Sequence, residues 1–192
     1  MGKYLDGVTQ FFSGIARDAE RETSPRRRAI LENYLAHAAL EYTDRWPEIF
    51  IPQRTVEHPI YKVRWGTPED VVYDGLDAVQ GFYRGLKDDK LLTNQDQLLA
   101  VNDWGFASFL NINLFMNGEK AMSLGFKVDD KDGDYVLITP CGMYWTYDRD
   151  VRLIGEYVYE IGVGKLEKVA SADRVTFADV QRIVAPHLPP PP

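Results

Sequence analysis

The order of two hydrophobic periodicities along the chain constrains the fold more than any other feature. Apolar residues recur at helical spacing in residues 4–19 and again from residue 25 to about 42. From about residue 97 onward the apolar residues alternate with a period of two, most clearly in residues 109–116. Helices followed by a meander of antiparallel strands predict an α+β domain whose helices pack on one face of the sheet.

Local signals mark the expected ends of these elements. Ser24 and Pro25 are typical of an N-cap and a first helical position. The segment 44–47 ends the second helix, residues 48–50 predict one helical turn, and residues 55–58 predict a short extended segment before Pro59. A third helix is expected from about residue 74 to residue 86.

Three turn signals divide the strand half of the chain. Asn117-Gly118, residues 131–134 and residues 148–150 each predict a hairpin turn. Thr176 with Asp179 three residues later predicts a short C-terminal helix, and the final prolines predict a polyproline arm.

Charge and cysteine content exclude several classes of protein. The net charge of −7 argues against nucleic acid or an anionic membrane as the main partner. No stretch approaches the roughly 18 apolar residues of a membrane span, and the N-terminus lacks a secretory pattern. The single cysteine excludes an intramolecular disulfide. We therefore expect a cytoplasmic protein, in which the basic run 26–28 is a solvated first helical turn.

One segment carries a resemblance to a known family. Residues 55–59, Thr-Val-Glu-His-Pro, are followed by residues 74–83, Asp-Gly-Leu-Asp-Ala-Val-Gln-Gly-Phe-Tyr. Together with the helix at residues 29–36 and the closing strand pair 143–159, they resemble the NTF2-like superfamily. That superfamily includes ketosteroid isomerase, scytalone dehydratase and the SnoaL-like cyclases.

The resemblance implies a fold and a division of the chain. It implies an NTF2-like cone, in which N-terminal helices pack in a strongly curved antiparallel sheet. The similarity covers about residues 25–162, so we expect an NTF2-like domain at 23–170. An amphipathic helix at 1–22 would precede this domain, and a helix with a polyproline arm at 171–192 would follow it. Proteins of this fold commonly dimerise through the outer sheet face, which predicts a homodimer with Asn111, Asn113 and Phe115 on that face.

The resemblance also implies site residues. His58 stands where the isomerases have their general-base aspartate, and Tyr34 stands where they have an oxyanion donor. Met143 stands where they have a protonated aspartic acid. Because this acid is missing, the resemblance implies the position of a pocket rather than the steroid reaction.

Strand alternation in the family's register predicts an apolar pocket. Inward-facing positions on the first half of the wall would be Leu110, Ile112 and Leu114. The closing hairpin would add Cys141, Met143, Trp145, Ile154, Glu156 and Val158, with Tyr61 as a further substrate contact. We expect a hydrophobic, cyclic small molecule as the ligand and no cofactor. A metal site is not expected, because no two of the three histidines are spaced like a metal pair.

The candidate chemistry is general acid–base catalysis. His58 would act as the base, Glu156 with a pKa raised by burial as an acid, and Tyr34 as a donor to an oxygen. This set fits a lyase, isomerase or cyclase of the SnoaL-like type. Two other functions stay open, which are a non-catalytic ligand-binding protein and a limonene-type epoxide hydrolase.

Each candidate also has a structural interpretation. His58 would then be a structural histidine whose hydrogen bonds are made within the fold, and Tyr34 would be a packing residue. Glu156 would be a surface residue if its strand slips by one position. Cys141 is read as a small buried hydrophobe rather than a nucleophile. Asp103 and Trp104 are read as turn residues, and His37 as a half-exposed helix residue.

Overall fold

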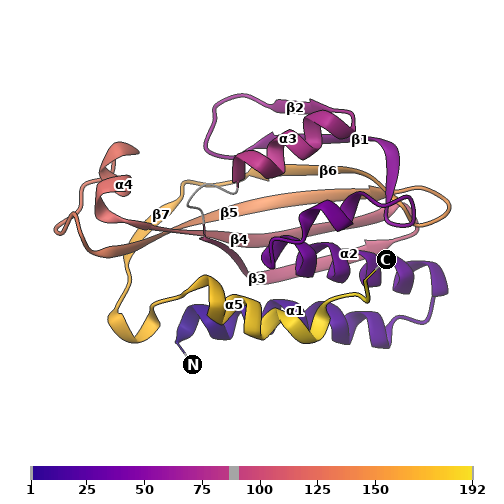
Figure 1. The fold of residues 1–192 in the computed structure, drawn as a ribbon, viewed down its shortest axis with the longest axis horizontal. Coiled ribbons are helices and arrows are strands. Elements are labelled where there is room, and N and C mark those ends of the chain that lie inside the picture. The colour runs from indigo at the N-terminus through magenta and orange to yellow at the C-terminus, as the bar shows by residue number, and fades with distance from the viewer. Residues whose placement is uncertain (1, 87–90, 192) are drawn as a thin grey trace.

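The computed structural model describes residues 2–86 and 91–191 of the chain (Figure 1). The helices are α1 (Lys3–Arg21), α2 (Pro25–Tyr42), α3 (Leu76–Leu86), α4 (Gly118–Ser123) and α5 (Phe177–Val184), with 3₁₀ turns η1 (Trp46–Phe50), η2 (Ser171–Asp173) and η3 (Ala185–His187). The strands are β1 (Thr55–Arg64), β2 (Val71–Asp74), β3 (Leu91–Asn102), β4 (Gly105–Asn117), β5 (Asp134–Tyr147), β6 (Leu153–Glu160) and β7 (Lys165–Lys168).

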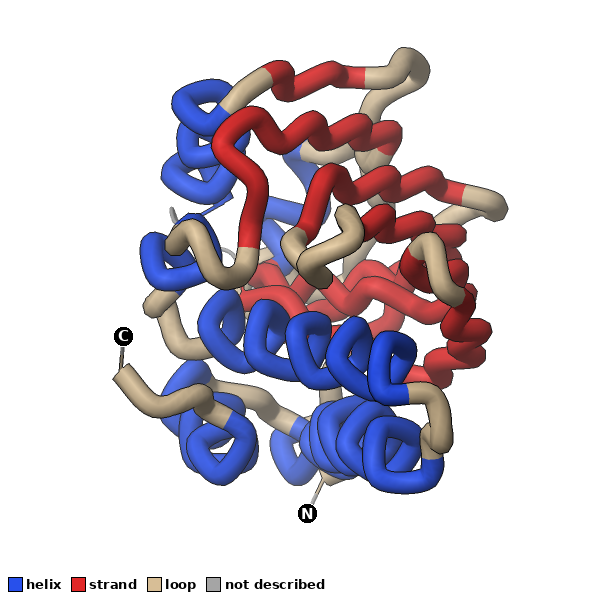
Figure 2. Tube along the Cα trace, turned by 90° about the vertical axis from the view of Figure 1, so that its right-hand side faces the viewer, coloured by secondary structure: helices blue, strands red, loops and turns tan. Residues whose placement is uncertain are grey.

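The strands form one curved sheet in the order β2-β1-β6-β5-β4-β3, with β7 pairing β5. All neighbouring strands are antiparallel except β1 and β6, which are parallel. In Figure 2 the strands curve around the helices rather than forming a flat layer. The predicted α+β class is confirmed, since N-terminal helices pack in a curved, mainly antiparallel sheet.

The two terminal helices belong to the same core as the rest of the chain. Helix α1 buries one face, which includes Val8, Phe12 and Ile15, against α2 and β3. Helix α5 lies beside α1 (Figure 1) and buries Val180 and Val184. The division at residues 22 and 170 stays a prediction. Within residues 2–86 and 91–191, no helix combines the length and apolar character that a membrane span requires.

The helix limits follow the sequence signals closely. The Ser24 hydroxyl accepts a hydrogen bond from the Arg27 backbone N–H at the start of α2, and Thr176 caps α5 in the same way. The expected turn at 148–150 joins β5 to β6. Each of these signals acts over a few residues, which is why the sequence alone reveals them.

The tight turn expected at Asn117-Gly118 is wrong, although β4 and β5 pair as antiparallel strands up to Asn117. The Asn117 side chain instead accepts a hydrogen bond from the Lys120 backbone N–H at 2.9 Å and caps helix α4. Gly118 is needed there for space, because a Cβ at this position would lie 2.1 Å from the Asp130 carbonyl oxygen. The same two residue types that favour a tight turn therefore start a helix here.

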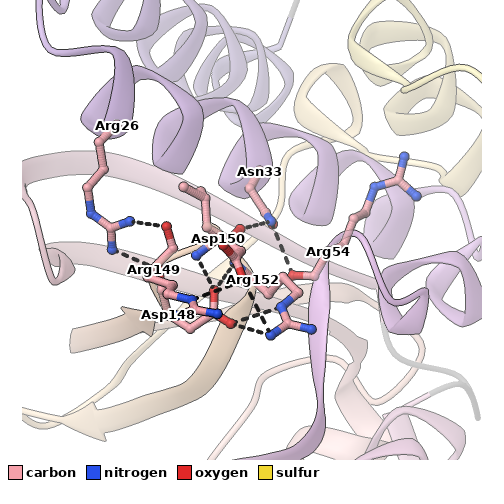
Figure 3. A network of polar contacts seen from close by, with 8 residues as sticks. Arg26, Asn33, Arg54, Asp148, Arg149, Asp150 and Arg152 are labelled. Carbon is pink, nitrogen blue, oxygen red and sulfur yellow. Dashed lines mark hydrogen bonds and ion pairs between the residues drawn. The ribbon is translucent and has the colours of Figure 1, made fainter.

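A polar network joins the start of α2 to the β5–β6 turn (Figure 3). Arg26 donates to the carbonyl oxygens of Asp103, Asp148 and Arg149 at 2.6–3.0 Å, so it is not the solvated residue that we expected. The Asp148 carboxylate accepts from the backbone N–H groups of Asp150 and Arg152 and from the Arg152 guanidinium. We call Arg26, Asp148, Asp150 and Arg152 the turn network.

Strand β3 contains a bulge that matters for the site. Its register with β4 shifts between Gln95 and Leu98, and Asp96 has a φ of 56°, which is unusual for a residue with a side chain. The Asp96 carboxylate accepts from the Asn111 amide at 3.1 Å and from the Gln95 amide at 3.2 Å. These side-chain bonds hold the bulge, and Gln97 follows it directly.

Candidate functional site

A cavity of about 70 Å³ lies between helix α2, helix α3 and the concave side of the sheet. Helix α2 contributes one stripe of residues, and β1, β3, β4, β5 and β6 contribute inward-facing ones. The lining residues are Tyr34, Ala38, Glu41, Tyr42, Val63, Trp65, Phe82, Leu92, Asn94, Ile112, Met143, Trp145, Glu156 and Val158. Most of them are apolar or aromatic. The few polar groups among them are therefore the candidates for binding or chemistry.

Two carboxyl groups, Glu41 and Glu156, line this cavity. Glu41 lies in the last turn of α2, and Glu156 lies on β6 opposite Trp145 of β5. The Glu156 residue is 8% exposed, whereas the Glu41 side chain is 33% exposed. No lysine, arginine or protonated histidine is among the described residues that line the cavity with them.

The surroundings of the two carboxyl groups raise both pKa values. Burial raises the pKa of Glu41 from its ordinary 4.5 to about 7. Burial also raises the pKa of Glu156 well above 4.5, and the charge of Glu41 raises it further. Both shifts favour the protonated form of the carboxyl group, and the pKa of about 7 means that Glu41 titrates near neutral pH.

Aromatic residues supply hydrogen-bond donors to the same cavity. The Trp145 Nε1 is buried and has no hydrogen-bond partner in the described part of the chain. The Tyr34 hydroxyl accepts from Gln97 Nε2 at 2.7 Å. One Glu156 carboxyl oxygen, Oε2, is also without a partner among these residues. Buried polar atoms without partners are rare in proteins, and the residues that carry these atoms line one cavity.

His37 is buried beside the cavity, not half-exposed as expected. Its Nε2 lies 2.8 Å from the Tyr83 hydroxyl and 3.9 Å from a Glu41 oxygen. Its ring packs edge-on against Trp145 at 4.5 Å. Burial lowers the pKa of His37 to about 3, so the ring is neutral at physiological pH and does not compensate the charge of Glu41.

The expectation that His58 reaches the pocket is wrong. The side chain is 70% exposed, and its Nε2 lies 2.7 Å from an Asp74 oxygen at the surface. Strand β1 turns Pro59, Tyr61 and Val63 inward, so alternation turns His58 outward. Matching the motif by sequence spacing placed the residue on the correct strand but on the opposite face.

The other predicted lining residues are placed as follows. Ile112, Met143, Trp145 and Val158 line the cavity together with Tyr34 and Glu156. Leu110, Cys141 and Tyr61 are fully buried in the core next to it, and Leu114 is half-buried. Their roles as ligand contacts stay predictions. Cys141 is buried, and burial raises the pKa of its thiol to about 12, which keeps it protonated.

The inward position expected for Ile154 is wrong. The residue is 37% exposed, whereas its neighbour Leu153 is fully buried. The register of β5 with β6 shifts between Thr146 and Tyr147, so the alternation that holds at Glu156 does not extend back to Ile154. Irregular register is a tertiary feature that a regular alternation pattern does not contain.

Sequence reasoning missed Glu41, although a signal for it exists. Tyr34, His37, Ala38 and Glu41 stand at positions i, i+3, i+4 and i+7 of α2, which is the spacing of one helix face. A glutamate on the face that carries the candidate tyrosine is therefore a candidate for the same pocket. The charge of the residue concealed it, since glutamate near a helix end is usually solvated.

The fold and the cavity define a small α+β domain with two carboxyl groups in a mainly apolar interior. Among the residues that the structure describes, no three His, Cys, Asp or Glu side chains cluster closely enough to hold a metal ion. The polar side chains of the described lining offer carboxyl, hydroxyl, amide and indole N–H groups.

Comparisons with known proteins found one similar structure to report and no similar sequence. No family model matches the sequence, and no curated protein matches it. One similar solved structure is that of SalBIII, described as an epoxide hydrolase/cyclase-like enzyme in pyran ring formation in the polyether salinomycin. The likeness covers 70% of this chain and 89% of SalBIII, with a TM-score of 0.41 and 12% identity. At this level the likeness concerns the fold and not the activity.

Proposed function

We propose that this protein is a small-molecule enzyme of the lyase or isomerase kind that uses Glu41 as a general base and protonated Glu156 as a general acid. The observation that carries the proposal is the pair of carboxyl groups with raised pKa values in one apolar cavity. Glu41 takes the role that the sequence analysis assigned to His58. Glu156 keeps the role predicted for it.

The two carboxyl groups divide one proton transfer between them. The Glu41 carboxylate removes a proton from carbon next to a carbonyl group, and its pKa of about 7 suits this task at neutral pH. Glu156 donates its proton to the oxygen on which negative charge develops, or to a departing oxygen. The apolar lining strengthens both steps, because charges interact more strongly where water is scarce.

Opening of an epoxide is the second candidate, and the carboxyl pair also favours it. Protonated Glu156 would donate to the epoxide oxygen, and Glu41 would take the proton of the attacking water or hydroxyl group. The limonene type of hydrolase joins two carboxylates through an arginine, and no arginine lines the cavity within the described residues. The pair therefore fits the general reaction but not that particular triad.

Exchange of substrate protons tests the proposal without knowledge of the natural substrate. Small cyclic ketones, beginning with cyclobutanone, are incubated with the protein in D₂O, and deuterium incorporation next to the carbonyl is followed by NMR. Small epoxides are tested in parallel for diol formation. We expect catalysed exchange that falls at least about 100-fold in Glu41→Gln, the usual scale for loss of a general base.

Two controls decide the outcome. Glu57→Gln makes the same chemical change at an exposed position of β1 and should leave the exchange rate unchanged. A ligand that binds but is neither exchanged nor opened by the unmodified protein contradicts the proposal and favours a non-catalytic binding protein. Equal rates in Glu41→Gln and in the unmodified protein contradict the assignment of the base.

The expected homodimer stays a proposal, with a revised interface. Asn113 is fully buried and Phe115 packs edge-on against Tyr4 of α1, so these two residues are not available to a partner. Leu98, Phe109 and Tyr144 lie on the exposed outer face of the sheet and supply apolar area instead. A dimer in light scattering that Phe109→Asp converts to a monomer supports this face, whereas a dimer that persists rejects it.

A further inference from the structure

The direction of one buried hydrogen bond carries information about the ligand. Tyr34 lines the cavity with only 2% of its surface exposed, and its hydroxyl accepts a hydrogen bond from the Gln97 side-chain amide at 2.7 Å. A tyrosine hydroxyl has one hydrogen to donate. Because Gln97 is the donor in this bond, the Tyr34 hydrogen stays available for a second partner.

The bulge in β3 is what brings Gln97 to this position. Between Gln95 and Leu98 the strand holds two residues opposite Leu110 of β4, and Asp96 takes the left-handed conformation. In a regular strand, residues 95 and 97 would share a face. Here Gln95 bonds to the Asn113 amide on one side, whereas Gln97 reaches Tyr34 on helix α2.

The surrounding structure holds the bulge in place. The Asp96 carboxylate is bonded by the amides of Asn111 and Gln95, and helix α1 passes so close that a Cβ at Gly7 would lie 3.2 Å from the Gln95 Cβ. A residue with a side chain at positive φ is strained, and this conformation persists only where neighbouring contacts determine it. Bulges of this kind often re-aim a side chain beside a functional site.

Trp145 supplies a second donor next to Tyr34. The two rings meet at 5.0 Å between centroids, and the indole is 2% exposed. Its Nε1–H donates only, and it has no partner among the described residues. A buried donor without a partner costs free energy, which a ligand atom that accepts the hydrogen bond would recover.

We propose that Gln97, turned inward by the β3 bulge, fixes the Tyr34 hydroxyl as a donor to the ligand, so that Tyr34 and Trp145 together select an uncharged oxygen acceptor. This inference rests on the proposed function, because it names the substrate class of the same cavity. A ketone, ether or epoxide oxygen meets the requirement. An anion is opposed by two carboxyl groups, and an ammonium group has no hydrogen-bond acceptor to offer the two donors.

The test compares ligands of one shape and three charges. Cyclobutanone, cyclobutylamine and cyclobutanecarboxylate are titrated at neutral pH, and the indole N–H signal of Trp145 is followed by ¹H–¹⁵N NMR, assigned with Trp145→Phe. We expect cyclobutanone to shift this signal and to bind at least about tenfold more tightly than the other two compounds. Comparable binding of the amine or the carboxylate overturns the proposal.

Two substitutions of nearly the same shape test the role of Gln97. Gln97→Met removes the donor, and Gln97→Glu replaces it with a group that accepts, so that Tyr34 turns its hydrogen away from the ligand. We expect cyclobutanone affinity to fall about fivefold in Gln97→Met, the scale of one hydrogen bond of about 1 kcal/mol, and further in Gln97→Glu. Equal affinity in the unmodified protein and Gln97→Glu overturns the assignment.

Folding and catalysis are measured separately. Dispersed NMR spectra show whether each Gln97 variant is folded, and if neither is, the ligand ranking and Trp145→Phe decide alone. Trp145→Phe removes the second donor without reference to the bulge, and unchanged cyclobutanone affinity in this variant overturns the proposal. Ketone binding with this selectivity but without proton exchange leaves the ligand class in place and rejects only the proposed function.

Discussion

The turn network and the cavity contain the same kinds of polar side chain, used in opposite ways. In the turn network, the Asp148 carboxylate accepts three hydrogen bonds from Asp150 and Arg152 (Figure 3). Arg26 donates three hydrogen bonds to backbone carbonyl groups. In the cavity, the Glu156 carboxyl has an oxygen without a described partner and faces a second carboxyl group. One arrangement stabilises the fold, whereas the other costs stability.

The difference is the reason for placing the proposed function in the cavity. Paired surface charges need no function, since they satisfy each other and the ends of the elements that they join. Carboxyl groups held in an apolar cavity with raised pKa values are unfavourable for folding, and proteins keep such groups mainly at sites of binding or catalysis. Four predictions test this contrast.

The largest expected change in stability comes from breaking the turn network. Asp148→Ala leaves the backbone N–H groups of Asp150 and Arg152 and the Arg152 guanidinium without their acceptor. We expect the free energy of unfolding to fall by about 2 kcal/mol, as for loss of charged hydrogen bonds. Urea denaturation measures it, and proton exchange in the cavity should not change. A loss below about 0.5 kcal/mol would show that water replaces the network.

Removing a carboxyl group of the cavity should instead raise the free energy of unfolding. Glu156→Leu replaces a buried acid by an apolar group of similar size, and it should raise the free energy of unfolding by about 1 kcal/mol while catalysis is lost. The same denaturation experiment measures the change. The matched control is Glu160→Leu on the same strand, where the carboxylate accepts from the Gly66 N–H at 2.9 Å and no gain is expected. Destabilisation by Glu156→Leu would mean that the acid has a structural role.

The free energy of unfolding should also fall as pH rises, because the pKa values of Glu41 and Glu156 are raised in the folded protein. The unfolded chain releases the Glu41 proton near pH 4.5, whereas the folded protein holds it until about pH 7. The free energy of unfolding therefore falls as pH rises through this window, and the raised pKa of Glu156 contributes in the same direction. Because solvent reaches part of Glu41, we expect a loss on the order of 1 kcal/mol from this group.

Thermal unfolding between pH 4.5 and 8 measures this dependence. Glu41→Gln cannot ionise, so its stability should be flatter across the window than that of the unmodified protein. Glu57→Gln, at the surface, should leave the slope unchanged. A slope in Glu41→Gln equal to that of the unmodified protein would contradict the pKa of about 7.

The smallest effect is expected at His58. Its pair with Asp74 is largely exposed, so His58→Ala should change the free energy of unfolding by less than about 0.5 kcal/mol. Proton exchange in the cavity should continue at the rate of the unmodified protein, because the side chain lies outside the sheet. Complete loss of exchange in a folded His58→Ala protein would return the base to the position that the family resemblance implied.

The sequence by itself determined the fold class and most of the element limits. Helical spacing in residues 4–19, the cap at Ser24 and the alternation in residues 109–116 are local patterns, and each acts over a few neighbouring residues. Glu156 and Trp145 were also found in this way, because regular alternation on a strand pair carries both to one face.

Only the tertiary structure decided which polar groups meet. The outward turn of His58, the shift that exposes Ile154, and the bulge that delivers Gln97 to Tyr34 all depend on strand register, which long-range pairing sets. Glu41 belongs to the site because α2 is packed against the concave side of the sheet. A carboxyl group becomes a base at neutral pH through this burial, and burial is a property of the folded chain rather than of the residue.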